Sequence, residues 1–216
     1  MAAARNAQYA PYAGWMLCPD FYELMPHDSI IPKTIITPGT GWKTIDLNRK
    51  EKDGTIRDPF VQGWKIHVNV APPHIVPLAK LICPVLQSMG VSHKFADPRQ
   101  YRERPDRYDG KAFTIYPKDP NDLVRVAKGL RDVFHANQNG DRNNRLIPYT
   151  SPAGVGVPGD LKLFRNGGFI SCRYGSFTRG DDIWNPIRKC RVPDRRDRPF
   201  PPFIKRPPKE IRSIQA

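Results

Sequence analysis

The sequence predicts an α+β domain, with a small mixed or antiparallel sheet that carries helices on one face and leaves the other face for chemistry. Three observations predict this fold. Short runs alternate apolar and polar residues, two segments repeat apolar residues at helical spacing, and the strands and helices are interspersed along the chain. A chain of 216 residues is also long enough to bury one hydrophobic core.

The clearest strand is the run 63–70, in which Lys65, His67 and Asn69 alternate with apolar residues. Because successive side chains of a strand point to opposite faces, these three polar groups share one face. A cation beside an imidazole on such a face is a candidate active site. The same pattern also fits a half-buried strand whose polar face simply meets water.

Two helices are predicted. The first repeats apolar residues at helical spacing from Ile75 to Met89 and ends at Gly90, a residue that commonly stops helices. The second has Asp119 as its N-cap and Pro120 in its first turn, and it ends near Ala136. Further strands are expected over residues 91–96, 111–116 and 168–174.

The other segments are predicted to be irregular. Residues 1–60 mix aromatic residues with turn formers, and residues 98–109 form a charged, arginine-rich loop. Residues 179–216 contain 11 Lys or Arg against 5 Asp or Glu, with seven prolines, so we expect an extended basic segment or linker there. The expected division is a domain over 1–178, with its core at 61–178, followed by this extension.

The composition narrows the class of partner. The formal net charge of +14 favours an anionic partner such as nucleic acid, membrane headgroups or a phosphorylated substrate. The four cysteines are scattered without zinc-ligand spacing, so we expect neither a structural metal nor a disulfide framework. Since no run of 18 apolar residues occurs, we expect a soluble, cytoplasmic protein without a membrane partner.

One motif is read as a loop. Residues 154–159 match G-x-G-x-x-G letter for letter, but no strand clearly precedes them and no helix follows. A dinucleotide site needs a strand, a tight turn and a helix at this motif. We therefore predict no nucleotide cofactor.

Several cationic and polar side chains can meet on the exposed sheet face. In the predicted strand 91–96, Lys94 lies opposite in direction to His93 and Phe95, so it faces away from the core if Phe95 packs inward. It would then share a face with Lys65, His67, Thr114 or Tyr116, and Arg173. Together these groups offer a base, an acid and an anion clamp, as proton abstraction coupled to phosphate departure requires.

The motifs resemble a known family. The segments Gly63-Trp64-Lys65-Ile66-His67-Val68, Gly90-Val91 with Lys94-Phe95, Gly110-Lys111 with Thr114-Ile115-Tyr116-Pro117, and Arg173-Tyr174-Gly175-Ser176-Phe177 resemble, in this order, the N-terminal lyase domain of class III and class IV lanthipeptide synthetases. That domain is in turn similar to bacterial effector phosphothreonine lyases.

The resemblance implies a phosphoserine/phosphothreonine lyase that acts by β-elimination without a metal or organic cofactor. It assigns Lys94 as the base, His67 as the acid and Lys65 as the group that stabilises the enolate-like charge. The residues implied to bind phosphate are Arg107, Lys111, Tyr116, Lys162, Arg165 and Arg173.

The chain departs from the family pattern in places. Asn69 replaces a small hydroxyl residue, and the shortened loop after Arg107 leaves Arg104 or Lys111 as substitutes for it. Lys162 and Arg165 fit the second phosphate position equally well. Since no kinase sequence follows, a separate or fused kinase would have to supply the phosphorylated substrate.

The expected function is therefore elimination of phosphate from a phosphorylated precursor peptide, giving dehydroalanine or dehydrobutyrine in lanthipeptide biosynthesis, with a kinase and a cyclase as partners. An effector lyase acting on host kinases is one alternative. A non-catalytic peptide-binding module or a basic nucleic-acid-binding module is another, although the leading interpretation involves no nucleic acid.

Overall fold

The computed structural model describes residues 34–37, 42–45, 62–103, 110–138, 150–151, 154–155, 157, 159–164, 169–176, 182–194 and 198–215. Its centre is a seven-stranded sheet in the order β1-β2-β4-β5-β3-β9-β8, in which every neighbouring pair is antiparallel. The strands are β1 (Thr34–Thr37), β2 (Trp42–Ile45), β3 (Gln62–Val68), β4 (Ser92–Ala96), β5 (Phe113–Tyr116), β8 (Leu161–Lys162) and β9 (Ile170–Ser176).

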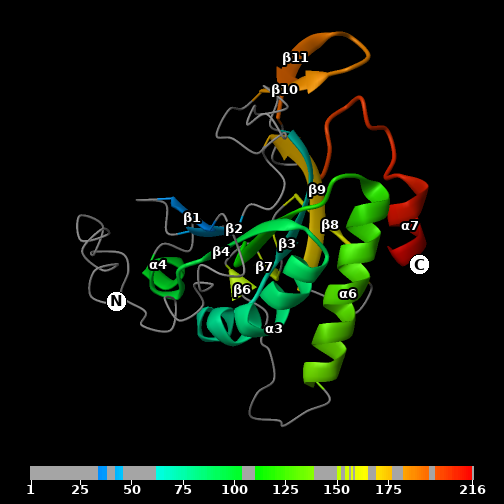
Figure 1. The fold of residues 1–216 in the computed structure, drawn as a ribbon. Coiled ribbons are helices and arrows are strands. Elements are labelled where there is room, and N and C mark those ends of the chain that lie inside the picture. Colours follow the sequence, from blue (N-terminus) through cyan, green and yellow to red (C-terminus); the bar gives the residue numbers. More distant parts are fainter. Residues whose placement is uncertain are drawn as a thin grey trace, which may run out of the picture.

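Helices α3 (Ile75–Ser88) and α6 (Pro120–Gln138) cover one face of this sheet, as Figure 1 shows. The short η2 (Pro72–His74) leads into α3. Apolar residues of β3 such as Ile66 and Val68 are completely buried against apolar residues of both helices, including Leu78 and Leu130. The predicted α+β class and the placing of helices on one face are confirmed.

The ends of the two helices follow from named contacts. Gly90 has a φ of +66°, a conformation that glycine adopts at little cost, and the Val91 N–H donates to the Leu86 carbonyl at 3.0 Å to close the end of α3. At the start of α6, Asp119 Oδ1 accepts from the Asp122 N–H at 2.9 Å. Both signals were predicted from the sequence.

One prediction of irregular structure was wrong, and a second segment contains two short strands that were not predicted. Residues Pro98–Glu103 form the short helix α4 rather than part of a loop, because Asp97 Oδ1 accepts from the N–H groups of Arg99 and Gln100 and Tyr101 is completely buried. Within residues 1–60, expected to be irregular, β1 and β2 extend the sheet beyond β4. Pairing with a neighbour, rather than internal alternation, produces these two strands.

The segment from residue 179 is not simply extended. It contains the hairpin β10 (Asp182–Asn185) and β11 (Cys190–Pro193) and the C-terminal helix α7 (Lys209–Gln215), which packs beside α6. Pro208 provides the carbonyl that accepts from the Arg212 N–H, and Ile211 is completely buried in the core. The prolines of this segment thus precede a helix, and Ile211 and Ile214 pack that helix against the core. The boundary of the domain stays a prediction.

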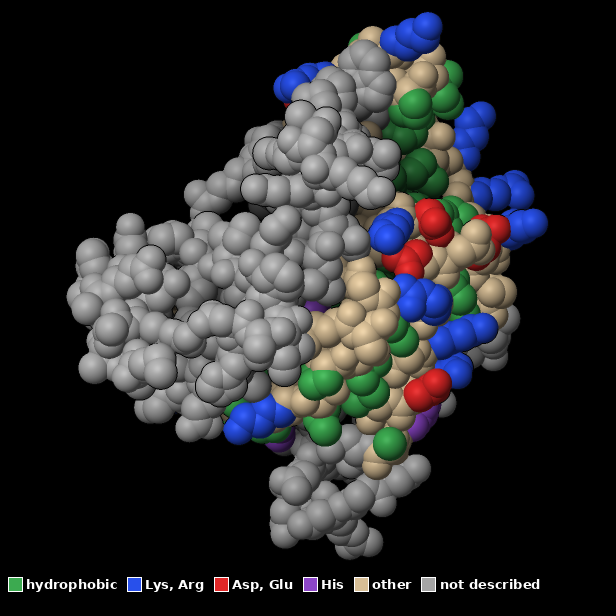
Figure 2. Space-filling model, in the orientation of Figure 1, with side chains coloured by type: hydrophobic (Ala, Val, Ile, Leu, Met, Phe, Trp, Pro, Cys, Tyr) green, Lys and Arg blue, Asp and Glu red, His purple; other side chains and the backbone are tan. Residues whose placement is uncertain are grey.

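The glycine-rich stretch begins with a two-residue strand and does not lead into a helix where it is described. The two-residue strands β6 (Thr150–Ser151) and β7 (Gly154–Val155) pair with each other, and no helix begins among the described residues 154–159. Across the described ranges, no helix is both long and apolar enough to span a membrane. Figure 2 shows Lys and Arg side chains along the edge of the molecule that runs downward from the β10–β11 hairpin.

We predict that replacing Ile211 with Ala destabilises the whole domain. Because this side chain is completely buried, its truncation removes packing and leaves a cavity, which typically costs about 2–5 kcal/mol. Urea unfolding followed by circular dichroism measures the change. Ile187→Ala is the matched control, since Ile187 is 75% exposed on the hairpin and should not alter the midpoint. Equal stability of both variants would show that α7 is not part of the folding unit.

Candidate active site

One row of side chains crosses the sheet on the face opposite the helices. In the antiparallel register, Lys94 of β4 lies opposite Thr114 of β5, and Thr114 lies opposite His67 of β3. His67 in turn lies opposite Ser171 of β9, and Ser171 opposite Lys162 of β8. Directly opposed residues point to the same face, so these five share it. Lys162, at the end of the row, is exposed.

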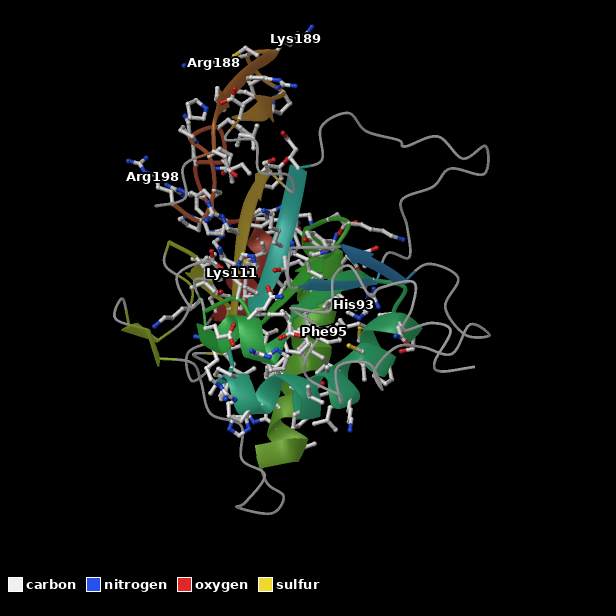
Figure 3. The ribbon with its side chains drawn as sticks, turned by 90° about the vertical axis from the view of Figure 1, so that its left-hand side faces the viewer. His93, Phe95, Lys111, Arg188, Lys189 and Arg198 are labelled. Atoms are coloured by element: carbon white, nitrogen blue, oxygen red, sulfur yellow. The ribbon has the colours of Figure 1, made fainter. Side chains whose placement is uncertain are left out.

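A second row lies beside the first. Lys65 of β3 is opposite Arg173 of β9, and Tyr116 is two residues from Thr114, so all three share the face of His67. Phe95 is completely buried on the other face, as the predicted placing of Lys94 required. The register therefore confirms that Lys65, His67, Lys94, Tyr116 and Arg173 share one face. Figure 3 looks onto the sheet from the side away from α6.

The remaining predicted residues divide into two groups. Lys111 is described: it follows Gly110, whose φ is +76°, and lies beside β3 in Figure 3, close enough to Lys65 and His67 to lower the pKa of each. Arg107, its proposed substitute Arg104, and Arg165 lie outside the described residues. Of the alternative phosphate-binding residues, the structure therefore describes Lys111 in the first set and Lys162 in the second.

His67 forms a buried pair with Asp160, which lies just before β8. The distance between His67 Nδ1 and Asp160 Oδ2 is 2.5 Å, and the two side chains are only 3% and 0% exposed. The Ser171 hydroxyl donates to the same carboxylate oxygen at 2.8 Å. Although burial disfavours the Asp160 carboxylate, His67, Ser171 and Arg173 outweigh it and hold the pKa of Asp160 below its ordinary value.

His67 is neutral near pH 7. Burial lowers its pKa from 6.5 to about 4, even though Asp160 acts in the opposite direction. Because an ionised carboxylate only accepts hydrogen bonds, His67 Nδ1–H donates to Asp160, and the lone pair is on Nε2. The dyad fixes the tautomer and the orientation of the ring, as a carboxylate does for a catalytic histidine.

The pKa of Lys65 is strongly lowered. Burial, and after it the charges of Arg173, Lys111 and Lys94, lower its pKa from 10.5 to about 7, although Asp194 acts in the opposite direction. Its Nζ donates to the Ser176 carbonyl at the end of β9. The lysine therefore exchanges its proton near neutral pH.

Arg173 is buried, and its guanidinium lies near groups of Arg198, Asp194 and Asp160. Its NH2 group donates to the Arg198 carbonyl at 3.3 Å and lies 3.7 Å from Asp194 Oδ1, while NH1 is 4.0 Å from Asp160 Oδ1. A guanidinium is planar, so contacts at both of its NH2 groups fix the orientation of that plane. The face thus presents preorganised cations, two of them partly desolvated.

No role for Asp160 or Asp194 was predicted from the sequence. Asp160 is 93 residues from His67 in the chain, and only the pairing of β3, β9 and β8 brings the two together. Asp160 lies two residues before Lys162, and the resemblance implied a role only for the lysine. In the described ranges, no group of three or more His, Cys, Asp or Glu side chains is placed to hold a metal ion.

Comparison with known proteins gives a partial family match. The family model "RamC, N-terminal domain" matches residues 46–142, a little under half of the chain. This range contains Lys65, His67, Lys94, Lys111 and Tyr116, and it ends before Asp160 and Arg173. No curated protein matches the sequence.

Three solved structures are similar in overall arrangement. The type III effector and phosphothreonine lyase OspF from Shigella flexneri is 13% identical, with a TM-score of 0.48, over 82% of this chain and 91% of that one. The Salmonella plasmid virulence C protein is 13% identical, with a TM-score of 0.47, over 92% and 86%. The phosphothreonine lyase effector VirA from Chromobacterium violaceum is 12% identical, with a TM-score of 0.41, over 80% and 84%.

We predict that the protein loses stability as the pH falls from about 6.5 to about 4. His67 and His93 each have a pKa of about 4 in the folded protein against 6.5 when unfolded. In that window the unfolded chain binds more protons, so lowering the pH favours unfolding, by roughly 3 kcal/mol per histidine at about 1.4 kcal/mol per pH unit.

The measurement is urea unfolding of the wild type and of His67→Gln at several pH values. Between pH 6.5 and 4, the free energy of unfolding of His67→Gln should fall by roughly 3 kcal/mol less than that of the wild type. Replacing the exposed His135 with Asn should leave the fall unchanged. A pH dependence that is identical in all three proteins would contradict the neutral, buried state of His67.

Proposed function

We propose that this protein is a phosphoserine/phosphothreonine lyase that eliminates phosphate from a phosphorylated precursor peptide and leaves dehydroalanine or dehydrobutyrine. The observation that carries the proposal is the row Lys94, Thr114 and His67 with Lys65 and Arg173 beside it. A general base, a proton donor and clustered cations on one face are the parts that this reaction needs.

Lys94 is the proposed base. It removes the proton from Cα of the phosphorylated residue, the C–H electrons form the Cα=Cβ bond, and the Cβ–O bond breaks as phosphate leaves with its electron pair. Lys94 and His67 lie two strands apart, a separation of about 10 Å between backbones at roughly 4.8 Å per strand. This gap leaves room for one substrate residue between the base and the acid.

His67 is the proposed acid, and it must gain a proton before it can act. A bound phosphate dianion provides the reason, since a nearby negative charge favours the imidazolium and raises the pKa of His67. Asp160 stabilises the same charged form through its hydrogen bond to Nδ1. Nε2 then carries the proton that passes to the departing phosphate oxygen.

Lys65 and Arg173 are the proposed anion clamp. With a pKa of about 7, Lys65 is only partly charged in the free protein, and a phosphate beside it restores the ammonium form. Arg173 is permanently charged and suits paired phosphate oxygens. Lys111, Tyr116 and Lys162 are further proposed contacts, and charge held in advance also stabilises the enolate formed at Cα.

The match to the RamC N-terminal domain supports a place in lanthipeptide biosynthesis. A lyase of this kind acts on a phosphate ester, so a kinase must first phosphorylate the precursor peptide. The dehydro residue it forms is an electrophile, so a reaction that adds a nucleophile such as a cysteine thiol can consume it. A separate or fused kinase and a cyclase are the proposed partners.

We predict that the protein converts a phosphothreonine or phosphoserine peptide to the dehydro peptide with release of phosphate. Lys94→Ala and His67→Ala should each lower the rate at least a hundredfold, because each removes a group that moves a proton in the reaction. Mass spectrometry of the peptide, together with a phosphate assay, follows the reaction.

The matched control is Lys80→Ala, since Lys80 is an exposed lysine of α3 on the opposite side of the sheet. The unphosphorylated peptide should not change. A phosphorylated host-kinase loop tests the effector alternative, and salt-dependent binding of a plain oligonucleotide without any elimination would favour the nucleic-acid alternative. Full turnover by Lys94→Ala would remove the base assignment.

We also predict that binding of the phosphopeptide takes up protons above pH 7. The anion raises the pKa of Lys65 and of His67, so protons enter the complex and affinity falls as the pH rises. Calorimetry with the inactive Lys94→Ala variant at pH 8, in two buffers of different ionisation enthalpy, measures the uptake. Adding Lys65→Met should reduce it, and zero uptake in both variants would contradict the proposed charge states.

A further inference from the structure

The C-terminal segment reaches back to the candidate active site along β9. The Tyr174 N–H donates to the Pro199 carbonyl at 2.8 Å, and Arg173 donates to the Arg198 carbonyl at 3.3 Å. The neighbouring strand β8 is paired only with Ser171 and Cys172 of β9. Residues from the segment after β11 therefore contact the stretch of β9 that β8 does not cover.

Asp194 makes the contacts that reach the site itself. Its Oδ2 accepts from the Ser176 N–H at 3.0 Å, and its Oδ1 lies 3.7 Å from Arg173 NH2. The carbonyl of the same Ser176 accepts from Lys65 Nζ. The Ser176 N–H thus donates to Asp194, and the Ser176 carbonyl accepts from Lys65. The Asp194 carboxylate therefore fixes the end of β9 that hydrogen-bonds to Lys65.

The Asp194 carboxylate lies against the backbone of Gly175, where a Cβ would otherwise be. A Cβ at Gly175 would lie 2.8 Å from Asp194 Oδ2, closer than real Cβ atoms approach a neighbour, and 3.0 Å from Oδ1, tighter than most Cβ contacts. Gly175 is not among the described glycines with a positive φ, so the backbone conformation does not require glycine. A Cβ at this position would instead force the Asp194 carboxylate to move.

We propose that Asp194 is a positioning residue of the candidate active site, holding Arg173 and the Ser176 support of Lys65 in place and keeping a carboxylate beside the two cations. This inference rests on the proposed function for its consequence in turnover. Its physical content, the control of Lys65 by Asp194, is independent of the reaction.

The charges around Lys65 determine the sign of the effect. Arg173 of β9, Lys111 before β5 and Lys94 of β4 each lower its pKa, and Asp194 raises it. His67 of the same strand is neutral near pH 7. Without the Asp194 carboxylate, Lys65 faces cations unopposed, and its pKa falls below about 7.

The test compares wild type, Asp194→Asn, Asp194→Glu and Asp182→Asn. Asp182 is the matched control because it is an exposed carboxylate of the hairpin. Competitive labelling of Lys65 with an amine reagent across pH 6–9, quantified by mass spectrometry, reports its titration without any need for activity. Asp194→Asn should shift the Lys65 labelling curve about half to one pH unit lower, Asp194→Glu should restore most of it, and Asp182→Asn should leave it unchanged.

Turnover gives the second readout. With a phosphopeptide, Asp194→Asn should raise KM several-fold and move the alkaline limb of kcat/KM to lower pH in step with the labelling curve. A variant that is only less well folded would lose activity without a shift in the alkaline limb of kcat/KM. Urea unfolding detects such a loss of stability. If the wild type eliminates nothing while the labelling shift is present, the proposed function fails and the positioning role stands.

Gly175 supplies an independent arm. Gly175→Ala in the wild type should displace the carboxylate and shift the Lys65 labelling curve as Asp194→Asn does. In an Asp194→Ala background, the same glycine substitution should have little further effect, because the clash is gone. Lys65 labelling unchanged by both Asp194→Asn and Gly175→Ala would overturn the proposal.

Discussion

The site depends on the antiparallel register between β3 and its two neighbours. Trp64, Ile66 and Val68 are buried against the helices, so β3 can lie in only one orientation. A slip of one residue would move Lys65 and His67 into the apolar core and place tryptophan on the polar face. The same burial that stabilises the fold therefore fixes which side chains of β5 and β9 meet His67.

Partial burial of cations is the second constraint. The face places Lys65 and Arg173 opposite each other, and desolvation together with like charges lowers the pKa of Lys65. Asp160 and Asp194 offset part of that charge, one on each side of Arg173. Both carboxylates are brought in by segments outside the central strands, so the outer parts of the chain set the electrostatics of the sheet face.

Sequence patterns predicted the elements with a strong local signal. The alternation in β3 and the stops of α3 and α6 depend on neighbouring residues, so the shared face of Lys65 and His67 followed from period alone. The placing of Lys94 also needed Phe95 to be buried in the core, as it is. Helix α7 and strands β1 and β2 could not be predicted from such local patterns. Packing on α6 stabilises α7, and pairing within the sheet stabilises β1 and β2. Asp160 escaped a functional assignment for the same reason, since its partner is distant in sequence.

The charge pattern bears on which anion such a face suits. A polyanion is bound by many exposed cations that release counterions along its length. Here the cations nearest His67 are half-buried or buried, three of them lower the pKa of Lys65, and two carboxylates offset part of their charge. A compact dianion relieves this repulsion at one point, and its charge brings protons to Lys65 and His67 together. In the proposed reaction, the phosphate of the substrate would then create the acid that later assists its own departure.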